Sequence, residues 1–204
     1  SRRRVLTTQF APGVDFDLAR EADEEQRRLW AKTFWRFVFK SLLQHGLFNA
    51  DPHPGNYLFS PDGVIYFLDF GCSRELSAHN QTLVRQCHRS ASSGDLDALC
   101  AAAIEMFQMP TSGPAAQMVR DYTKLCFKPI WHEGRFKITQ DYTTTLMNGM
   151  RNNAKILFKG SRNDFKPLPA EWVFFNRLQL GFYSVLARLD VAVDYRTLDA
   201  SLLP

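Results

Sequence analysis

The sequence predicts an α+β fold that is mostly helical, with one small β-hairpin in the first half of the chain. After about residue 77, long stretches repeat their apolar residues every three or four positions, as amphipathic helices do. The hairpin is indicated by Ser60-Pro61-Asp62-Gly63, a turn sequence between two short β-rich runs. The chain has 204 residues, 45% hydrophobic and 23% charged. This composition excludes collagen-like, disordered and disulfide-scaffold proteins, and the 17 phenylalanines indicate an aromatic-rich core.

The N-terminal part of the chain is predicted to contain a strand and a long helix. Val5–Phe10 is rich in β-branched and apolar residues, and Ala11-Pro12-Gly13 follows it as a turn. The helix is expected over Glu24–His45 and ends at Gly46. Its predicted apolar face consists of Trp30, Phe34, Phe37, Val38, Ser41 and Leu42.

The other side of this helix carries a basic residue at every fourth position. These residues are Arg28, Lys32, Arg36 and Lys40. A stripe of this kind is usually a solvated face. The alternative is a docking surface for anionic lipid or for an acidic partner.

The hairpin follows a loop and precedes a run of helices. Pro52 and Pro54 predict that Asn49–Asn56 is a loop, and the two hairpin strands are expected at Tyr57–Phe59 and Val64–Leu68. Another turn is expected at Asp69-Phe70-Gly71. The predicted helices are Ser77–Ser93, Leu96–Phe107, Ala115–Trp131, Tyr142–Phe158 and Glu171–Leu189, with loops at Pro110–Pro114 and Gly160–Pro169.

Charge, cysteines and hydropathy limit the functional classes. The formal charge is 25 − 21 = +4, which permits an anionic partner without requiring one. The four cysteines form no C-x-x-C pair and have no histidine at zinc-finger spacing, so we expect free thiols in a reducing compartment and no structural metal site. Trp172–Leu189 is the most apolar stretch, but polar and charged residues interrupt it. We therefore expect a cytoplasmic protein or one that is peripheral to a membrane.

Three residues have the spacing required for Mg-nucleotide phosphoryl transfer. Kinase-like folds place a catalytic aspartate in a loop, an asparagine five residues later and a second aspartate after a β-hairpin. Asp51 and Asn56 have this separation (56 − 51 = 5), and Asp69 ends the second predicted hairpin strand, directly before Phe-Gly. Taken singly, Asp51 and Asn56 would more often be turn residues, and Asp-Phe-Gly is a common tripeptide. Their combined order and spacing predict a phosphoryl-transfer site.

The same residues resemble a known family. Ala50-Asp51-Pro52-His53-Pro54-Gly55-Asn56 followed by Phe67-Leu68-Asp69-Phe70-Gly71 resembles the UbiB/AarF-type atypical kinases, the ubiquinone-biosynthesis protein-kinase-like proteins. Phe175–Leu189 is similar to the C-terminal helix of that family, and Val5–Gly13 to its hinge strand between lobes. The resemblance implies a protein-kinase-like C-lobe with an added helical extension. Residues 1–13 would be the hinge strand and turn, 14–110 the C-lobe and 111–204 the extension.

The resemblance also implies roles for individual residues. Asp51 would be the catalytic base or the carboxylate that orients the substrate, and ATP and Mg²⁺ would be the cofactors. Asn56 and Asp69 would hold Mg²⁺. His53 would either donate to the γ-phosphate or brace the loop. The backbone that meets adenine would be that of Gln9, Phe10 and Ala11.

The sequence departs from the family pattern in two ways. Asn49 stands where the family loop usually begins with a histidine, which predicts altered loop geometry or activity. The chain also has no Gly-rich phosphate loop, no strand lysine ahead of the hinge and no K-x-G-Q signature. We therefore expect the N-lobe to be absent, and with it about half of the nucleotide site.

Three functions remain open at this point. The first is an atypical kinase or ATPase linked to isoprenoid-quinone or lipid metabolism, with a nucleotide, a small-molecule or lipid-related substrate and the missing N-lobe as partners, and no nucleic acid. The absence of an A-P-E sequence after Gly71 disfavours protein substrates. The second is a small-molecule phosphotransferase of the aminoglycoside or choline kinase type. The third is an inactive pseudokinase scaffold.

Overall fold

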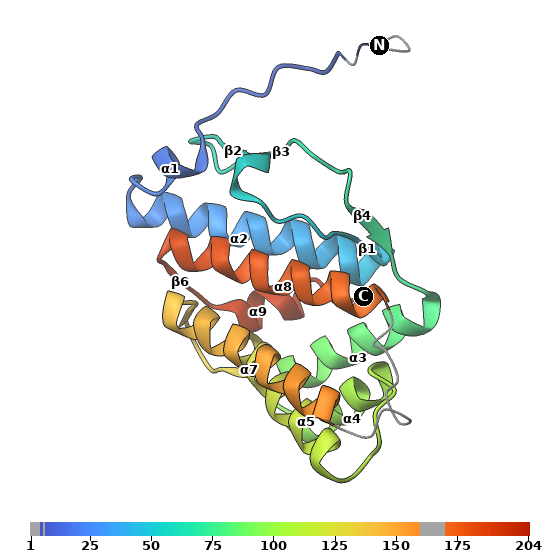
Figure 1. Cartoon of the computed structure of the whole chain (residues 1–204). Helices are drawn as coiled ribbons and strands as arrows, with labels where there is room; N and C mark the ends of the chain where they lie inside the picture. Colours follow the sequence, from blue (N-terminus) through green and yellow to red (C-terminus); the bar gives the residue numbers. More distant parts are fainter. Residues whose placement is uncertain (1–4, 6, 160–169) are drawn as a thin grey trace.

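A computed structural model of the chain describes residues 5, 7–159 and 170–204, and it confirms a mostly helical α+β fold (Figure 1). The helices are α1 (Phe16–Ala19), α2 (Glu24–Lys40), the π-helical turn η1 (Ser41–His45), the 3-10 turn η2 (Pro54–Asn56), α3 (Ala78–Ser93), α4 (Leu96–Met106), α5 (Pro114–Cys126), α6 (Lys128–Trp131), α7 (Gln140–Lys159), α8 (Ala170–Leu189) and α9 (Tyr195–Ala200). The strands are β1 (Leu47–Asn49), β2 (Tyr57–Phe59), β3 (Ile65–Phe67), β4 (Ser73–Glu75), β5 (Phe136–Lys137) and β6 (Ala192–Val193).

The strands of the described residues form three antiparallel pairs instead of a single hairpin. The predicted hairpin is β2–β3, with Tyr57 opposite Phe67. The pairs β1–β4 and β5–β6 were not predicted, and the expected loop was wrong at Asn49, which ends β1 opposite Ser73. These strands are two or three residues long and pair with segments far away in the chain. No local alternation of apolar and polar residues could therefore predict them.

The strand expected at Val5–Phe10 is not formed over residues 7–10, because residues 7–13 lie outside helices and strands; Val5 itself lies in a β-bridge. In Figure 1 this segment extends away from the helical body. A β-rich sequence becomes a strand only where a neighbouring strand supplies hydrogen bonds. Beyond this segment, Val14 exchanges backbone hydrogen bonds of 2.9 and 2.8 Å with Phe59 of β2.

Helix α2 lies at the centre of the fold and is buried on more sides than its sequence predicted. Phe37 and Val38 of the predicted apolar face are only half-buried, whereas Trp35 and Phe39 are buried. The reason is that α2 packs against β3 and α8 and also against α9 and β6. The ring of Phe34 stacks on a phenylalanine of α8, with centroids 5.2 Å apart. The phenylalanine-rich composition therefore does supply an aromatic core.

The later helices agree with the predicted ones except at one break. Instead of a single helix over Ala115–Trp131, the chain forms α5 and α6, separated at Phe127. Pro129 has no N–H to donate to the carbonyl of Leu125, four residues earlier. That carbonyl accepts a hydrogen bond from the Tyr142 hydroxyl at 2.5 Å. The predicted loop at Gly160–Pro169 lies outside the described residues.

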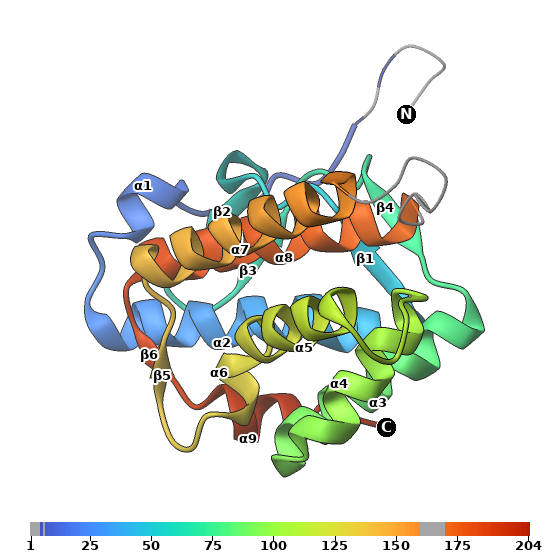
Figure 2. The same cartoon turned by 60° about the horizontal axis from the view of Figure 1, so that its bottom comes forward.

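The helices form layers around α2. Helix α8 lies between α2 and α7, while α3, α4 and α5 cover the other end of the body (Figures 1 and 2). Buried apolar side chains from Phe16 to Leu202 belong to one core cluster. All four cysteines are free. In the described part of the chain, no helix combines the length and the apolar character needed to cross a membrane.

Candidate active site

The β2–β3 hairpin is attached firmly to α2. The indole nitrogen of Trp30 donates to the carbonyl of Ser60 at 2.8 Å, and the Thr33 hydroxyl donates to the carbonyl of Gly63 at 3.1 Å. Gly63 has φ +84°, and a Cβ there would lie 2.5 Å from Cδ2 of Leu29. This close contact fixes the two segments that flank the hairpin, which hold the predicted catalytic and metal-binding residues.

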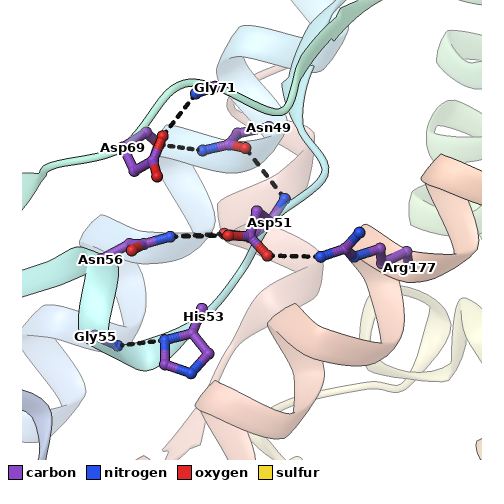
Figure 3. A network of polar contacts seen from close by, with 8 residues as sticks. All are labelled: Asn49, Asp51, His53, Gly55, Asn56, Asp69, Gly71 and Arg177. Carbon is purple, nitrogen blue, oxygen red and sulfur yellow. Dashed lines mark hydrogen bonds and ion pairs between the residues drawn. The ribbon is translucent and has the colours of Figure 1, made fainter.

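Asp51 and Asn56 contact each other across the loop that precedes β2 (Figure 3). Asn56 Nδ2 donates to Asp51 Oδ2 at 3.1 Å and lies 3.4 Å from the Asp51 carbonyl oxygen. This hydrogen bond fixes the orientation of the Asn56 amide, since its nitrogen faces Asp51. Oδ1 of Asn56 accepts no hydrogen bond from the residues that the structure describes, so it is available as an oxygen ligand.

Asn49 joins this loop to the Asp69 segment. Its Nδ2 donates to the backbone carbonyl of Asp69 at 2.7 Å, and its Oδ1 accepts from the backbone N–H of Asp51 at 3.1 Å (Figure 3). One side chain thereby connects the two segments that carry the predicted catalytic and metal-binding carboxylates. Sequence reasoning marked Asn49 as a departure from the family histidine and assigned the asparagine itself no linking role.

Asp69 lies in a turn that engages only one of its two carboxylate oxygens. Gly71 N–H donates to Asp69 Oδ1 at 2.7 Å, and the turn closes with a 3.1 Å hydrogen bond from Ser73 N–H to the carbonyl of Phe70. Among the described residues, Asp69 Oδ2 accepts no hydrogen bond. Asp69 is exposed to solvent.

These donors fit Mg²⁺ better than a closed structural metal site. Asn56 Oδ1 and the Asp69 carboxylate are hard oxygen ligands, and Mg²⁺ in nucleotide sites typically takes one or two carboxylates together with phosphates and water. No three or more His, Cys, Asp or Glu side chains gather into a metal cage in the described part of the chain. An open, oxygen-only site is what a Mg-nucleotide would require.

His53 braces the loop. Its Nδ1 accepts a hydrogen bond from Gly55 N–H at 3.1 Å and caps the 3-10 turn η2. A neutral imidazole that accepts through Nδ1 carries its proton on Nε2. The bracing contact predicted for His53 is therefore formed, and Nε2–H remains available as a donor. Its contact with a γ-phosphate stays a prediction.

Arg177 reaches the loop of Asp51 from helix α8. Its Nη2 donates to Asp51 Oδ1 at 2.8 Å (Figure 3). Sequence reasoning assigned this arginine no role, since 126 positions separate it from Asp51 and no local pattern joins them. Nearby, burial and the negative charge of Asp51 raise the pKa of Tyr57, the first residue of β2.

The predicted adenine-contacting residues are not brought to this network. Gln9 and Phe10 are exposed, with Phe10 84% exposed, and the segment that carries them and Ala11 extends away from the body (Figure 1). Their role stays a prediction.

A cavity of about 260 Å³ adjoins the loop. It lies among α2, η1, β1, the hairpin, the Asp69 turn and α8, and its walls are mainly apolar. The lining includes Phe37, Leu47, Phe67, Phe70 and Leu178, together with Asn49.

The fold and the site together define a kinase-like lobe, in which a β-hairpin separates an Asp/Asn loop from an Asp-Phe-Gly turn. The sequence profile of the ABC1 atypical kinase-like domain matches residues 1–103. The chain therefore belongs to the ABC1 atypical kinase-like family, as its resemblance to UbiB/AarF-type kinases predicted.

Curated relatives agree with this assignment. Protein ACTIVITY OF BC1 COMPLEX KINASE 3, chloroplastic, of Arabidopsis thaliana is 40% identical over 75 residues, which are 36% of this chain and 10% of that protein. Kinase 8 of the same plant series is 26% identical over 115 residues, 54% of this chain and 15% of that protein. The matched segments thus span about a tenth to a seventh of these relatives.

The similarity to a solved structure covers almost the whole chain. It is to Rv3197 of Mycobacterium tuberculosis, solved in complex with erythromycin, with a TM-score of 0.68 and 21% identity over 96% of this chain and 48% of that one. At this identity the similarity supports the fold alone.

Proposed function

We propose that this chain is the catalytic-loop lobe of a Mg-ATP-dependent atypical kinase or ATPase. The observation that carries the proposal is the continuous network from Asn56 through Asp51 and Asn49 to the backbone of Asp69. The network connects Asp51, whose carboxylate can orient a hydroxyl, with Asn56 and Asp69. In the described part of the chain, Asn56 and Asp69 each keep one side-chain oxygen that accepts no hydrogen bond. Phosphoryl transfer needs this combination, because its catalysis is mainly positioning and charge stabilisation.

Each side chain has a stated part in the reaction. Asp51 accepts a hydrogen bond from the attacking hydroxyl of the acceptor or of water, and takes its proton as the γ-phosphoryl group moves to that oxygen and ADP leaves. Asn56 Oδ1 and the Asp69 carboxylate would hold Mg²⁺, which when bound neutralises charge on the phosphates. Nε2–H of His53 donates to the γ-phosphate, and the Gln9–Ala11 backbone meets adenine.

The substrate and setting of the whole protein are also part of this proposal. We infer a small-molecule or lipid-related acceptor linked to isoprenoid-quinone metabolism, with peripheral contact to a membrane. The family membership and the exposed end of the basic stripe, Arg36 and Lys40, support this proposal. Arg28 is not part of a free basic surface, since it pairs with Glu24 and donates to the carbonyl of Ala192 at 3.1 Å.

Asp69→Asn tests the metal-ligand assignment. In the full-length protein we expect Mg-ATP at about 100 times its Kd to stabilise the wild type by about 2.7 kcal/mol, seen as a rise in Tm. The variant should lose most of that rise, since a neutral amide replaces the open carboxylate.

Asp62→Asn is the matched control, because Asp62 is an exposed aspartate in the turn of the same hairpin. It should keep the full Mg-ATP-dependent rise in Tm. An equal rise in wild type and Asp69→Asn would refute the assignment of Asp69. Phosphorylation of an added amino alcohol or aminoglycoside would instead favour a small-molecule phosphotransferase, and binding without turnover would favour a scaffold.

A further inference from the structure

Helix α8 contacts the loop that carries Asp51 at two points on one of its faces. Arg177 Nη2 donates to Asp51 Oδ1 at 2.8 Å. Four residues later, Gly181 lies so close to the loop that a Cβ there would be 2.3 Å from Cγ of Pro52. Residues four apart share one face of a helix. The helix therefore meets both Asp51 and the proline that follows it.

Helix α8 is itself held rigidly against the core. Phe182, next to Gly181, is fully buried and stacks on Phe34 of α2 with ring planes 8° apart. The hydroxyl of Tyr183 donates to the carbonyl of Cys126 at 3.0 Å. Because α2 also holds the hairpin, the helix that carries Arg177 and the loop that carries Asp51 share one fixed support.

The two oxygens of Asp51 are held from opposite directions. Asn56 donates to Oδ2 from within the loop, and Arg177 donates to Oδ1 from α8 (Figure 3). Two donors on different oxygens define the plane of the carboxylate, which one donor alone would leave free to rotate. The Asp51 side chain is still 32% exposed, and each carboxylate oxygen can accept a second hydrogen bond. A substrate hydroxyl can therefore reach Asp51 while both contacts persist.

We propose that Arg177 is a positioning residue for the phosphoryl-transfer reaction: it fixes the orientation of the Asp51 carboxylate, while Gly181 permits the close approach of α8 that this requires. The proposal rests on the proposed function of Asp51. An exposed ion pair of this kind contributes little to stability, so the effect belongs to catalysis rather than to folding. Misplacement of a reacting group by about 1 Å costs on the order of 100-fold in rate.

The test compares Arg177→Met, Arg177→Lys and Gly181→Ala in the full-length protein. We expect Arg177→Met to lower kcat for Mg-ATP turnover by about 10- to 100-fold, with KM for ATP nearly unchanged and Mg-ATP-dependent stabilisation retained. Arg177→Lys should recover part of kcat, because an ammonium restores the charge but not the geometry of the guanidinium. Gly181→Ala should lower kcat by displacing the loop.

Arg188→Met is the matched control, since Arg188 lies on the same helix and forms an ion pair of 2.9 Å with Asp17. It should leave kcat at the wild-type level. Wild-type or faster turnover by Arg177→Met would overturn the proposal. Faster turnover would indicate that Arg177 blocks the access of substrate to Asp51.

A second readout separates this inference from the proposed function. If the wild type binds no Mg-ATP and shows no turnover, the proposed function fails, but hydrogen exchange still measures the loop. Faster amide exchange over residues 51–56 in Arg177→Met, with wild-type exchange in Arg188→Met, would support positioning. Unchanged exchange in Arg177→Met would overturn it.

Discussion

Asn49 is the residue on which the geometry of the candidate site depends most. It makes one hydrogen bond to each of the two segments that carry Asp51 and Asp69. The family pattern places a histidine at this position, and the substitution predicted altered geometry or activity. That effect on geometry or activity stays a prediction. In this chain the amide connects the loop to the Asp69 turn through both its donor and its acceptor, since an amide offers both functions in one planar group.

Asn49→Ala should therefore uncouple the two segments. Two hydrogen bonds are lost, each with a net contribution of about 1 kcal/mol, so the free energy of unfolding should fall by about 2 kcal/mol in urea denaturation. Asn148→Ala, at an exposed asparagine on α7, should cost far less. Equal losses in the two variants would show that Asn49 is not a structural link.

Among the single residues of the site, those that local spacing identifies were predictable from the sequence. Asp51 and Asn56 are five positions apart, and Asp69 follows the hairpin strand, so order alone identifies them as candidates. Arg177 was unpredictable because its contact depends on how α8 packs, which no local pattern encodes. The predicted hinge residues Gln9–Ala11 were identified by resemblance, and nothing in the described network contacts them.

At the scale of elements, the α2–hairpin contact gives the site its rigidity. Gly63 lies at that contact. It has a positive φ, which disfavours any side chain, and it faces Leu29 of α2. Two hydrogen bonds from α2 side chains to the hairpin backbone reinforce the same contact. The hairpin was predictable because Pro-Asp-Gly is a local signal, whereas its docking on α2 was not.

Gly63→Ala should destabilise the protein more than Gly94→Ala. Both glycines have φ +84°, so the backbone strain, about 1–2 kcal/mol, is matched. Only Gly63 adds a collision, because the nearest atom to a Cβ at Gly94 lies 3.8 Å away. We expect a further loss of about 1–2 kcal/mol from overpacking, measured as the difference in unfolding free energy between the variants. Equal costs would show that Leu29 moves aside freely.

At the scale of the whole molecule, one buried polar contact joins three helices. Nδ1 of His88 on α3 lies 2.9 Å from Oδ2 of Asp199 on α9, and the Trp35 indole of α2 donates to Oδ1 at 3.2 Å. All three side chains are fully buried. Burial also raises the pKa of the Cys87 and Cys126 thiols to about 12. These thiols stay protonated and serve as packing groups.

The global arrangement was the part least accessible from sequence. Helix positions followed from apolar periodicity, and most of the predicted ranges in the C-terminal half match the structure within two residues. The β1–β4 and β5–β6 pairs and the buried contact of His88 with Asp199 join positions far apart in the chain. Their formation depends on the complete core, since strands this short have no stability of their own.

The most direct test of the account is Mg-ATP turnover by the full-length protein and by its Asp51→Asn variant, with and without anionic lipid vesicles. The amide keeps the size of the side chain and an acceptor for Arg177, but it cannot take a proton from the attacking hydroxyl. We expect the wild type to turn over ATP and the variant to be slower by about 10²- to 10⁴-fold, with its Mg-ATP-dependent stabilisation retained. Equal turnover by the two proteins would contradict the central claim that Asp51 carries phosphoryl transfer.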